Sequence, residues 1–376
     1  MKTRVIHLQE GQDRAVARNL RTAVMVGKPQ VVPGKRSALE VLAHVWRDVR
    51  AVITSLGAPG VAVVAVDTQR VRVAGSMCIA AKPGMVNAGI VGRHGQCDLF
   101  LEGDGALSLR HLVVVVDPMT AWDGPAAGPG WDVRYRLIDL RTSGGFRDEA
   151  GRQLEAATVE GPAFVFIGRY ALFCFPTGAA DAWPDDAKAA IAALPERSYS
   201  DERDAEPDRW RRGRHAQTSS RDQWAEGSKV EDPEPSADSF SSRRASVITR
   251  VTSVNGPARA RIDALGEGDE LLGTLELQSR LGNDSVRVGA AGAERGLLLG
   301  RYSRCDTAGA TSLSLEKISR VHLLVVRIGD DIWAIDTAST NGVASGGTGV
   351  RVHRLQPGDE LSLADGVGAV RWRPVH

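Results

Sequence analysis

Three short motifs occur twice in this chain, in the same order and at similar spacing. Each copy has a glycine–arginine motif (G-R-x-x-x-C-D), then a serine-to-histidine motif, then an aspartate-to-glycine motif. They stand at residues 92–98, 107–111 and 139–145 in the first copy, and at 300–306, 318–322 and 336–342 in the second. An internal repeat limits the choice of fold strongly, because both copies must form the same arrangement of elements. We therefore predict two domains of one kind.

The segments around the motifs are short apolar runs, many of them alternating with polar residues, which is typical of β-strands. They lie at 61–66, 71–74, 77–80, 86–91 and 164–175 around the first copy, and at 247–254, 272–277, 285–288, 297–299, 323–326 and 332–335 around the second. We predict an all-β fold of two β-sandwiches, with a short N-terminal helical region and a disordered linker.

The clearest helix signal lies just before the first copy. Ser37 and Glu40 fit a capping box. Apolar residues, including Trp46, then recur at helical spacing until Gly57 supplies a stop. Such a stripe can form a groove for a partner, but it more often belongs to a core. We expect this helix to pack on the domain that follows.

The composition divides the chain into four parts. We predict a helical segment at 1–57, a first sandwich at 58–178, a short helix and linker at 179–245, and a second sandwich at 246–376. From Pro195 to about Arg244 the chain is polar, with interleaved charges and few aliphatic residues. Such a segment cannot bury enough apolar surface to offset its ordering entropy, so we predict that it is disordered.

The second copy carries residues suited to a phosphorylated side chain, which has close to two negative charges and three acceptor oxygens. Arg301 supplies an always-charged donor fork, and Arg320 adds a second charge. Ser319 and Thr340 supply hydroxyls, and Asn341 suits a peptide backbone because its amide both donates and accepts.

Three further residues of the second copy are interpreted as structural. Gly300 opens the first motif, and Gly342 fits a turn that needs a positive φ. His322 lies between the serine loop and an apolar run, where we expect it to hold the loop by hydrogen bonds. Two ordinary β-turns would also collect Ser, Thr, Asn and Gly, but they would not explain the arginine and the strand flanks.

The pattern G-R, S-R-x-H and D-x-x-S-T-N-G resembles the forkhead-associated (FHA) domain, from about residue 271 to the C-terminus. This resemblance implies a β-sandwich that reads phosphothreonine, with the histidine in a structural role. It implies phosphothreonine-containing proteins as partners, a Ser/Thr protein kinase as the source of the mark, and no cofactor or metal. We predict an adaptor that binds through the second sandwich.

The first copy departs from that pattern. Arg93, Ser108 and Ser143 are retained, and Arg110 lies beside the position of Arg320. Gly144 stands where the second copy has Asn341, so it offers no side chain to a peptide backbone. We predict either a weak second phosphate site or a sandwich kept for packing or dimerisation, and the sequence leaves both open.

Two other functions compete with the adaptor. The chain has no phosphate loop, nucleophile elbow, metalloprotease or kinase signature, and we predict no enzymatic activity. A nitrogen of His322 aimed at the Ser319 hydroxyl would instead favour an enzyme. FHA-like proteins also occur as subunits of bacterial assemblies, so a structural subunit that binds partners without phosphate is the alternative function.

The net charge and the cysteines limit the partners and the compartment that we predict for this protein. The formal net charge is +1, which gives no general attraction for nucleic acid or a membrane surface. A basic patch at 209–215 is flanked by acidic residues, so we interpret it as solvated linker. The four cysteines show no metal-ligand spacing, and neither a leader nor a membrane-spanning run is evident. We predict a soluble cytoplasmic bacterial protein.

The N-terminus and the linker contain candidate self-ligands. Thr3, Thr218 and Ser246 lie in segments that a kinase could reach. A tethered phosphothreonine would face the second sandwich at a high effective concentration. The simpler interpretation is that these are ordinary exposed hydroxyl residues in polar chain.

Overall fold

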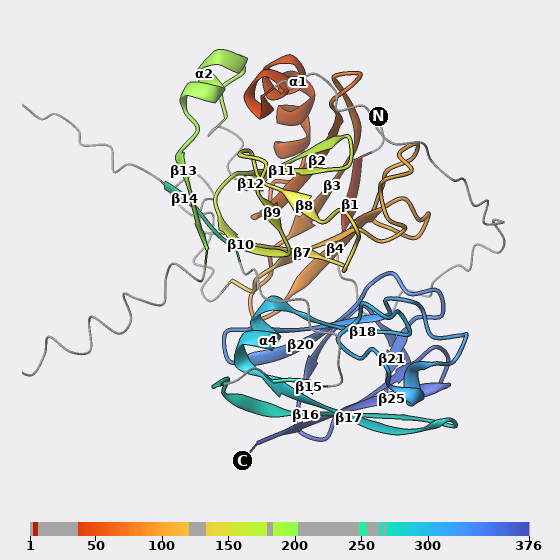
Figure 1. The fold of residues 1–376 in the computed structure, drawn as a ribbon. Helices are drawn as coiled ribbons and strands as arrows, with labels where there is room; N and C mark the ends of the chain where they lie inside the picture. Colours follow the sequence, from red (N-terminus) through yellow and green to blue (C-terminus); the bar gives the residue numbers. More distant parts are fainter. Residues whose placement is uncertain are drawn as a thin grey trace, which may run out of the picture.

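The computed structural model describes residues 3–6, 37–119, 133–178, 183–201, 248–253, 263–265 and 268–375. These residues form two β-sandwiches, with helices at one end of the first (Figure 1). Most of residues 1–36, most of the linker with its basic patch at 209–215, and the candidate self-ligands Thr218 and Ser246 lie outside the described residues.

The first sandwich consists of two sheets. One has the order β1-β3-β2-β12-β11-β8-β9 and the other the order β13-β14-β10-β7-β6-β4-β5. The strands are β1 (Thr3–Ile6), β2 (Gly60–Asp67), β3 (Arg72–Ala80), β4 (Asn87–Gly92), β5 (Leu99–Phe100), β6 (Leu112–Val116), β7 (Arg134–Asp139), β8 (Phe146–Arg147), β9 (Gln153–Leu154), β10 (Ala156–Glu160), β11 (Ala163–Ile167), β12 (Tyr170–Thr177), β13 (Glu196–Asp201) and β14 (Ile248–Ser253).

The second sandwich also has two sheets, of order β15-β17-β16-β25-β24-β21-β22 and β18-β19-β20-β23. The strands are β15 (Asp263–Ala264), β16 (Leu271–Ser279), β17 (Gly282–Gly289), β18 (Leu297–Leu299), β19 (Leu323–Ile328), β20 (Asp331–Asp336), β21 (Val343–Ser345), β22 (Thr348–Val350), β23 (Val352–Leu355), β24 (Glu360–Leu363) and β25 (Gly368–Pro374). A short helix, α4 (Ala290–Arg295), joins β17 to β18, and a 3-10 turn, η2 (Thr311–Leu313), follows β18.

The two sandwiches share one topology. The order β3-β2-β12-β11-β8-β9 in the first corresponds strand for strand to β17-β16-β25-β24-β21-β22 in the second. The strands β4, β6, β7 and β10 likewise correspond to β18, β19, β20 and β23. The sequence repeat is therefore a structural repeat, and the prediction of an all-β fold with a helical region before the first sandwich is confirmed.

The helices cover the outer face of the first sandwich. Helix α1 (Ala38–Ile53) begins with the predicted capping box between Ser37 and Glu40, and ends at Thr54 rather than at Gly57. Trp46 is buried and its indole N–H donates to the carbonyl of Pro184, just before α2 (Ala187–Ala192). Alternate residues of β2 pack under α1, so the expectation that the helix packs on the next domain is confirmed.

The two sandwiches pack directly on each other. In β6, Leu112, Val114 and Val116 point into the core of the first sandwich, while Val113 and Val115 point toward the second. Strand β19 does the same, since Leu323 and Val325 belong to the second core and Leu324 and Val326 face the first sandwich. Successive side chains of a strand lie on opposite sides, so both strands are buried on both faces.

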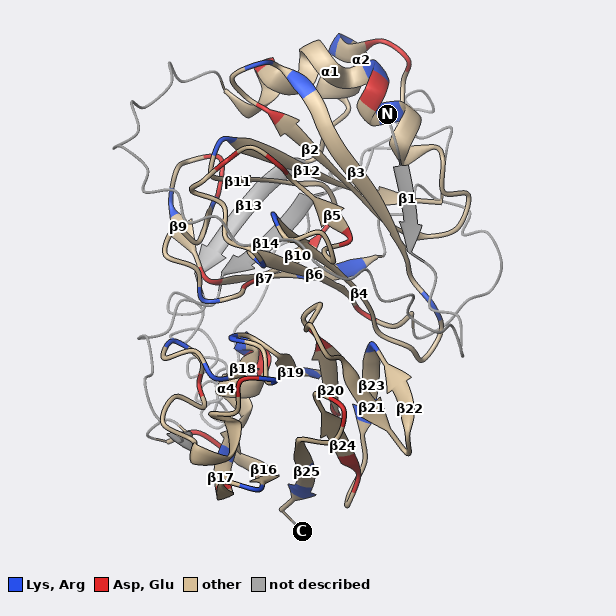
Figure 2. Cartoon of the chain, turned by 90° about the vertical axis from the view of Figure 1, so that its right-hand side faces the viewer, with Lys and Arg blue, Asp and Glu red and all other residues tan. Residues whose placement is uncertain are grey.

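We call this contact the shared apolar face. Its members are buried apolar residues of both sandwiches: Val86, Ala88, Ile90, Cys97, Val113, Val115, Ile138, Leu140, Ala156, Leu298, Cys305, Val321, Leu324, Val326, Ile328, Trp333, Ile335 and Ala338. From one end to the other the molecule is a stack of helices, two sheets of the first sandwich and two sheets of the second. Figure 2 shows this stack from the side.

Two predictions about boundaries are wrong. Residues 196–201, assigned to the disordered linker, form strand β13, which pairs in parallel with β14. Strand β14, assigned to the second sandwich, pairs with β10 and so extends a sheet of the first.

The shared apolar face predicts that the two sandwiches unfold together. Leu324 is fully buried in that face, so Leu324→Ala should lower the free energy of unfolding by about 2–5 kcal/mol, as large-to-small core substitutions do. Leu281→Ala, at an exposed residue of the same sandwich, is the control and should change it little. Scanning calorimetry of the full chain should show one transition that Leu324→Ala moves as a whole. Two separate transitions, only one of them moved, would contradict a common core.

Candidate functional site

The loops that carry the three motifs of the second copy meet at one end of the second sandwich. The loop at 300–322 connects β18 to β19, and the loop at 337–342 follows β20. Ser319 joins them, because its hydroxyl accepts from the Thr340 N–H at 3.0 Å and its carbonyl accepts from the Arg301 N–H at 3.3 Å. The residues predicted for the phosphate therefore lie together.

Arg301 is exposed and partly fixed. Its Nε donates to the carbonyl of Ile318 at 2.9 Å, which sets the direction of the guanidinium. The rest of the guanidinium makes no ion pair with a described residue and so keeps its donors for a ligand. Arg320 and Thr340 are also exposed, so two positive charges border the loops.

Gly300 is required by a close approach of the backbone. A Cβ at this position would lie 2.2 Å from the carbonyl oxygen of Arg320, which is much shorter than any real contact. Thr307, which stands outside the three sequence motifs, is buried, and its hydroxyl bonds both the N–H and the carbonyl of Gly300, at 3.2 and 3.3 Å. Together these contacts fix the start of the loop that carries Arg301.

His322 is fully buried and both of its nitrogens bond the backbone. Nδ1 accepts from the Ser319 N–H at 3.0 Å, so Nε2 carries the proton and donates to the carbonyl of Gly342 at 3.0 Å. Burial lowers the pKa of the imidazole below its usual value, although the nearby Asp336 carboxylate acts in the opposite direction. A neutral imidazole therefore ties the two loops together.

This geometry removes the basis for a serine–histidine nucleophile. The ring of His322 bonds the backbone N–H of Ser319 and not its hydroxyl. That hydroxyl is itself an acceptor for the Thr340 N–H. A base must lie within hydrogen-bond reach of the proton it removes, with a lone pair free to take it. In His322 the lone pair of Nδ1 already accepts one hydrogen bond, and the proton on Nε2 is already donated in another.

Asn341 is held by the neighbouring loop. Its side-chain N–H donates to the carbonyl of Lys317 at 2.7 Å, which leaves the amide oxygen to accept from a ligand. Gly342 has a φ of 72°, the left-handed region that favours glycine. The Asp336 carboxylate accepts from the Ser339 N–H at 2.7 Å and so closes the turn that presents Thr340 and Asn341.

The first copy repeats the structural contacts of the second. Arg93 is exposed and its Nε donates to the carbonyl of Leu107 at 2.6 Å. The Nδ1 of His111 accepts from the Ser108 N–H at 3.1 Å, and its Nε2 donates to the carbonyl of Gly145 at 2.8 Å. The backbone frame of the site is therefore the same in both sandwiches.

The side chains of the first copy differ at the ligand face. The hydroxyl of Thr142 donates to Asp139 and accepts from the Gly145 N–H, so it closes its own turn. Ser143 is exposed and Gly144 has no side chain. Arg110, predicted as a stand-in for Arg320, instead points across to the second sandwich. The first copy thus keeps the frame and presents fewer donors.

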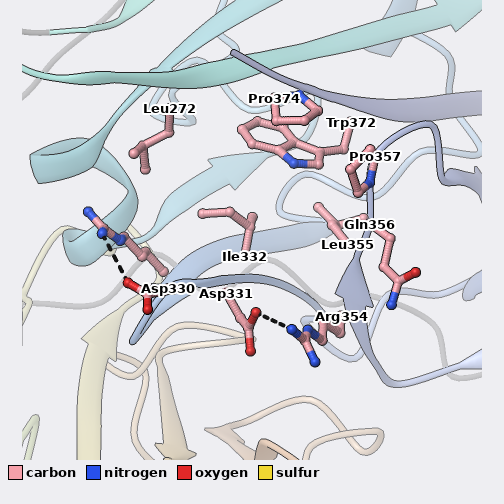
Figure 3. Close-up of a pocket in the computed structure, with 11 residues that line it drawn as sticks. Leu272, Asp330, Asp331, Ile332, Arg354, Leu355, Gln356, Pro357, Trp372 and Pro374 are labelled. Carbon is pink, nitrogen blue, oxygen red and sulfur yellow. Dashed lines mark hydrogen bonds and ion pairs between the residues drawn. The ribbon is translucent and has the colours of Figure 1, made fainter. Parts of the chain in front are cut away.

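A groove of about 340 Å³ lies elsewhere on the second sandwich (Figure 3). Ile332, Leu355 and Trp372 form its apolar side, and the ion pairs Arg327–Asp330 and Arg354–Asp331 border it. The turn from β19 to β20 contributes to it, whereas the site loops adjoin the other ends of these strands. The groove therefore contains none of the predicted site residues.

Among the described residues, no cluster of His, Cys, Asp and Glu side chains could hold a metal ion. None of the helices in the described ranges has the length and apolar character needed to cross a bilayer.

Residues 297–364 match the family model of the FHA domain. That range contains every site residue predicted for the second copy. A search of curated proteins finds no match. Similar solved structures include a domain from work on "phosphothreonine-dependent FHA domain interactions", which is 23% identical with a TM-score of 0.23, over 27% of this chain and 97% of that chain.

Two other similar structures are bacterial FHA domains. FHA-1 of Mycobacterium tuberculosis Rv1747 is 23% identical with a TM-score of 0.23, over 28% of this chain and 99% of that chain. The FHA domain of CT664 from Chlamydia trachomatis is 17% identical with a TM-score of 0.24, over 27% of this chain and 97% of that chain.

The buried imidazole of His322 in the second sandwich predicts a dependence of stability on pH. Because the folded pKa of His322 lies below that of the unfolded chain, the unfolded state binds more protons between the two values. Stability should therefore fall as the pH drops below about 6.5. Urea unfolding at pH 7.5 and 5.5 should show a smaller loss for His322→Gln than for the unchanged protein. Equal losses would mean that folding does not lower the pKa of this histidine.

Proposed function

We propose that this chain is an adaptor that binds phosphothreonine peptides through the loops of its FHA domain. The observation that carries the proposal is the state of Arg301. Its Nε is bonded to the carbonyl of Ile318, its side chain is exposed, and it lies on a loop that Ser319 joins to the loop of Thr340. A preorganised guanidinium with free donors is suited to a phosphate, because charge-assisted bonds to its oxygens are strong.

The residues around Arg301 support a peptide rather than a free phosphate as the ligand. Ser319 and Thr340 add short polar groups, and Arg320 adds a second charge. The amide oxygen of Asn341 can accept a backbone N–H of a peptide, which inorganic phosphate does not offer. FHA domains are phosphothreonine-binding modules, so we expect phosphothreonine-containing proteins and a Ser/Thr kinase as partners, in the bacterial cytoplasm.

We further propose that the first sandwich is a degenerate FHA domain. The common strand order and the matching contacts of Arg93 and His111 support this. Gly144 in place of Asn341 weakens it as a reader. The sequence left two roles open for this sandwich, a weak phosphate site or a part kept for packing or dimerisation. The shared apolar face favours packing, because one face of this sandwich is buried against the second.

The test compares matched arginines in the full chain. Arg301→Ala should weaken binding of a phosphothreonine peptide by more than about tenfold, since hydrogen bonds to charged groups contribute roughly 1.5–3 kcal/mol. Arg93→Ala removes the equivalent residue of the first copy and should leave the affinity nearly unchanged. The affinity is measured by calorimetry on a peptide selected from a phosphothreonine library, with its unphosphorylated form as control.

The reverse pattern, in which Arg93→Ala abolishes binding and Arg301→Ala does not, would move the reader to the first sandwich. Equal binding of the phosphorylated and unphosphorylated peptides would favour the alternative, a structural subunit that recognises its partner without phosphate.

A further inference from the structure

One arginine of the first sandwich reaches the ligand loop of the FHA domain. Arg110 donates through Nε and Nη2 to the carbonyl oxygen of Ala338, at 2.8 and 2.6 Å. Ala338 precedes Ser339, Thr340 and Asn341 and is itself buried. A planar guanidinium fork that binds one oxygen with two N–H groups fixes both the position and the direction of that carbonyl.

The carbonyl that Arg110 holds belongs to an unusual backbone conformation. Ala338 has a φ of 60°, in the left-handed region that a residue with a Cβ rarely adopts. Such a conformation persists only where surrounding contacts favour it. Within the FHA domain the Asp336 cap on the Ser339 N–H acts on one side of Ala338. Arg110 acts on the residue itself, and it comes from the other sandwich.

Two ion pairs connect the sandwiches and fix how they pack on each other. Asp98 of the first copy pairs with Arg351 of the second, and its counterpart Asp306 pairs with Arg141 of the first, at 3.2 Å. Both aspartates end the G-R-x-x-x-C-D motif, and both also accept from a backbone N–H of a strand in their own sandwich, at 2.8 Å. These reciprocal contacts set the register in which Arg110 meets Ala338.

The positive charge of Arg110 also acts on His322, which lies behind the ligand loops. Burial is the main cause of the lowered pKa of His322, the residue that joins the two ligand loops, and the positive charge of Arg110 acts in the same direction. Arg110 therefore lies close to both the loop that it bonds and the histidine that anchors it. Arg110 itself belongs to the first sandwich, so the first sandwich adds a contact to the frame of the second.

We infer that the first sandwich serves as a built-in scaffold for phosphopeptide binding by the second, and that Arg110 is a positioning residue for the loop of Thr340 and Asn341. This inference rests on the proposed function. Arg110 acts by holding Ala338, so that the donors and acceptors after it are in place before the ligand arrives, which lowers the cost of binding.

The test uses four variants of the full chain and a labelled pool of peptides with a fixed phosphothreonine and mixed flanking residues. Arg110→Ala removes the fork, and Arg110→Lys keeps the charge but not the two-pronged geometry. Arg136→Ala is the matched control, because Arg136 also crosses the contact and donates to the carbonyl of Arg327, at the far end of β19. Arg301→Ala reports on the proposed function.

Fluorescence anisotropy should show that Arg110→Ala and Arg110→Lys each weaken binding of the pool by about fivefold or more, within the usual range of coupling between sites. Arg136→Ala should leave the affinity unchanged even if it lowers the melting temperature. Amide hydrogen exchange of residues 337–342 should become faster in Arg110→Lys and not in Arg136→Ala.

Three outcomes would overturn the inference. If Arg110→Ala binds as well as Arg136→Ala does while Arg301→Ala fails to bind, the site is intact without the scaffold. If Arg110→Lys binds like the unchanged protein with unchanged exchange, Arg110 acts by charge and not by position. If Arg301→Ala binds normally, the proposed function fails, and this inference fails with it.

Discussion

The packing of one sandwich on the other is the interaction on which the rest of the structure depends. Strands β6 and β19 are apolar on both faces, so each sandwich alone would expose a sheet of valine, leucine and isoleucine to water. Burying that surface is favourable in proportion to its area, and it brings the two copies together in one orientation. The ion pairs of Asp98 and Asp306 then select that orientation. The two copies of the repeat therefore form one packed unit and not two independent domains.

The two sandwiches have the same backbone contacts in their motif loops but carry different side chains at the loop tips. In both copies the glycine, arginine, serine and histidine hold the same backbone contacts, so this frame stabilises the loops whether or not a ligand binds. The proposed binding of a phosphopeptide needs additional side chains at the tip of the loops. The second copy has Thr340 and Asn341 there, whereas the first has a glycine and sends Arg110 outward to its neighbour.

The contacts within a motif could be predicted from sequence because they join residues close along the chain. The roles of His322 and the capping box of α1 are of this kind. The partner of Arg110 could not, since Ala338 is 228 residues away and the contact depends on how two domains pack. A signal for that packing was present: 112–116 and 323–326 are continuous apolar runs, whereas a sandwich strand with one wet face alternates. Strand β14 was assigned to the wrong sandwich because its alternation fits either sheet.

The central claim is that the two sandwiches form one packed unit in which only the second sandwich binds phosphothreonine. It is tested most directly by amide chemical-shift mapping on the deuterated full chain, with a phosphothreonine peptide and its unphosphorylated form. The account predicts shifts at Arg301, Ser319, Thr340 and Asn341 with the phosphorylated peptide only, and none at the equivalent residues around Arg93. Shifts concentrated around Arg93, or in the groove beside Trp372, or the same with both peptides, would contradict it.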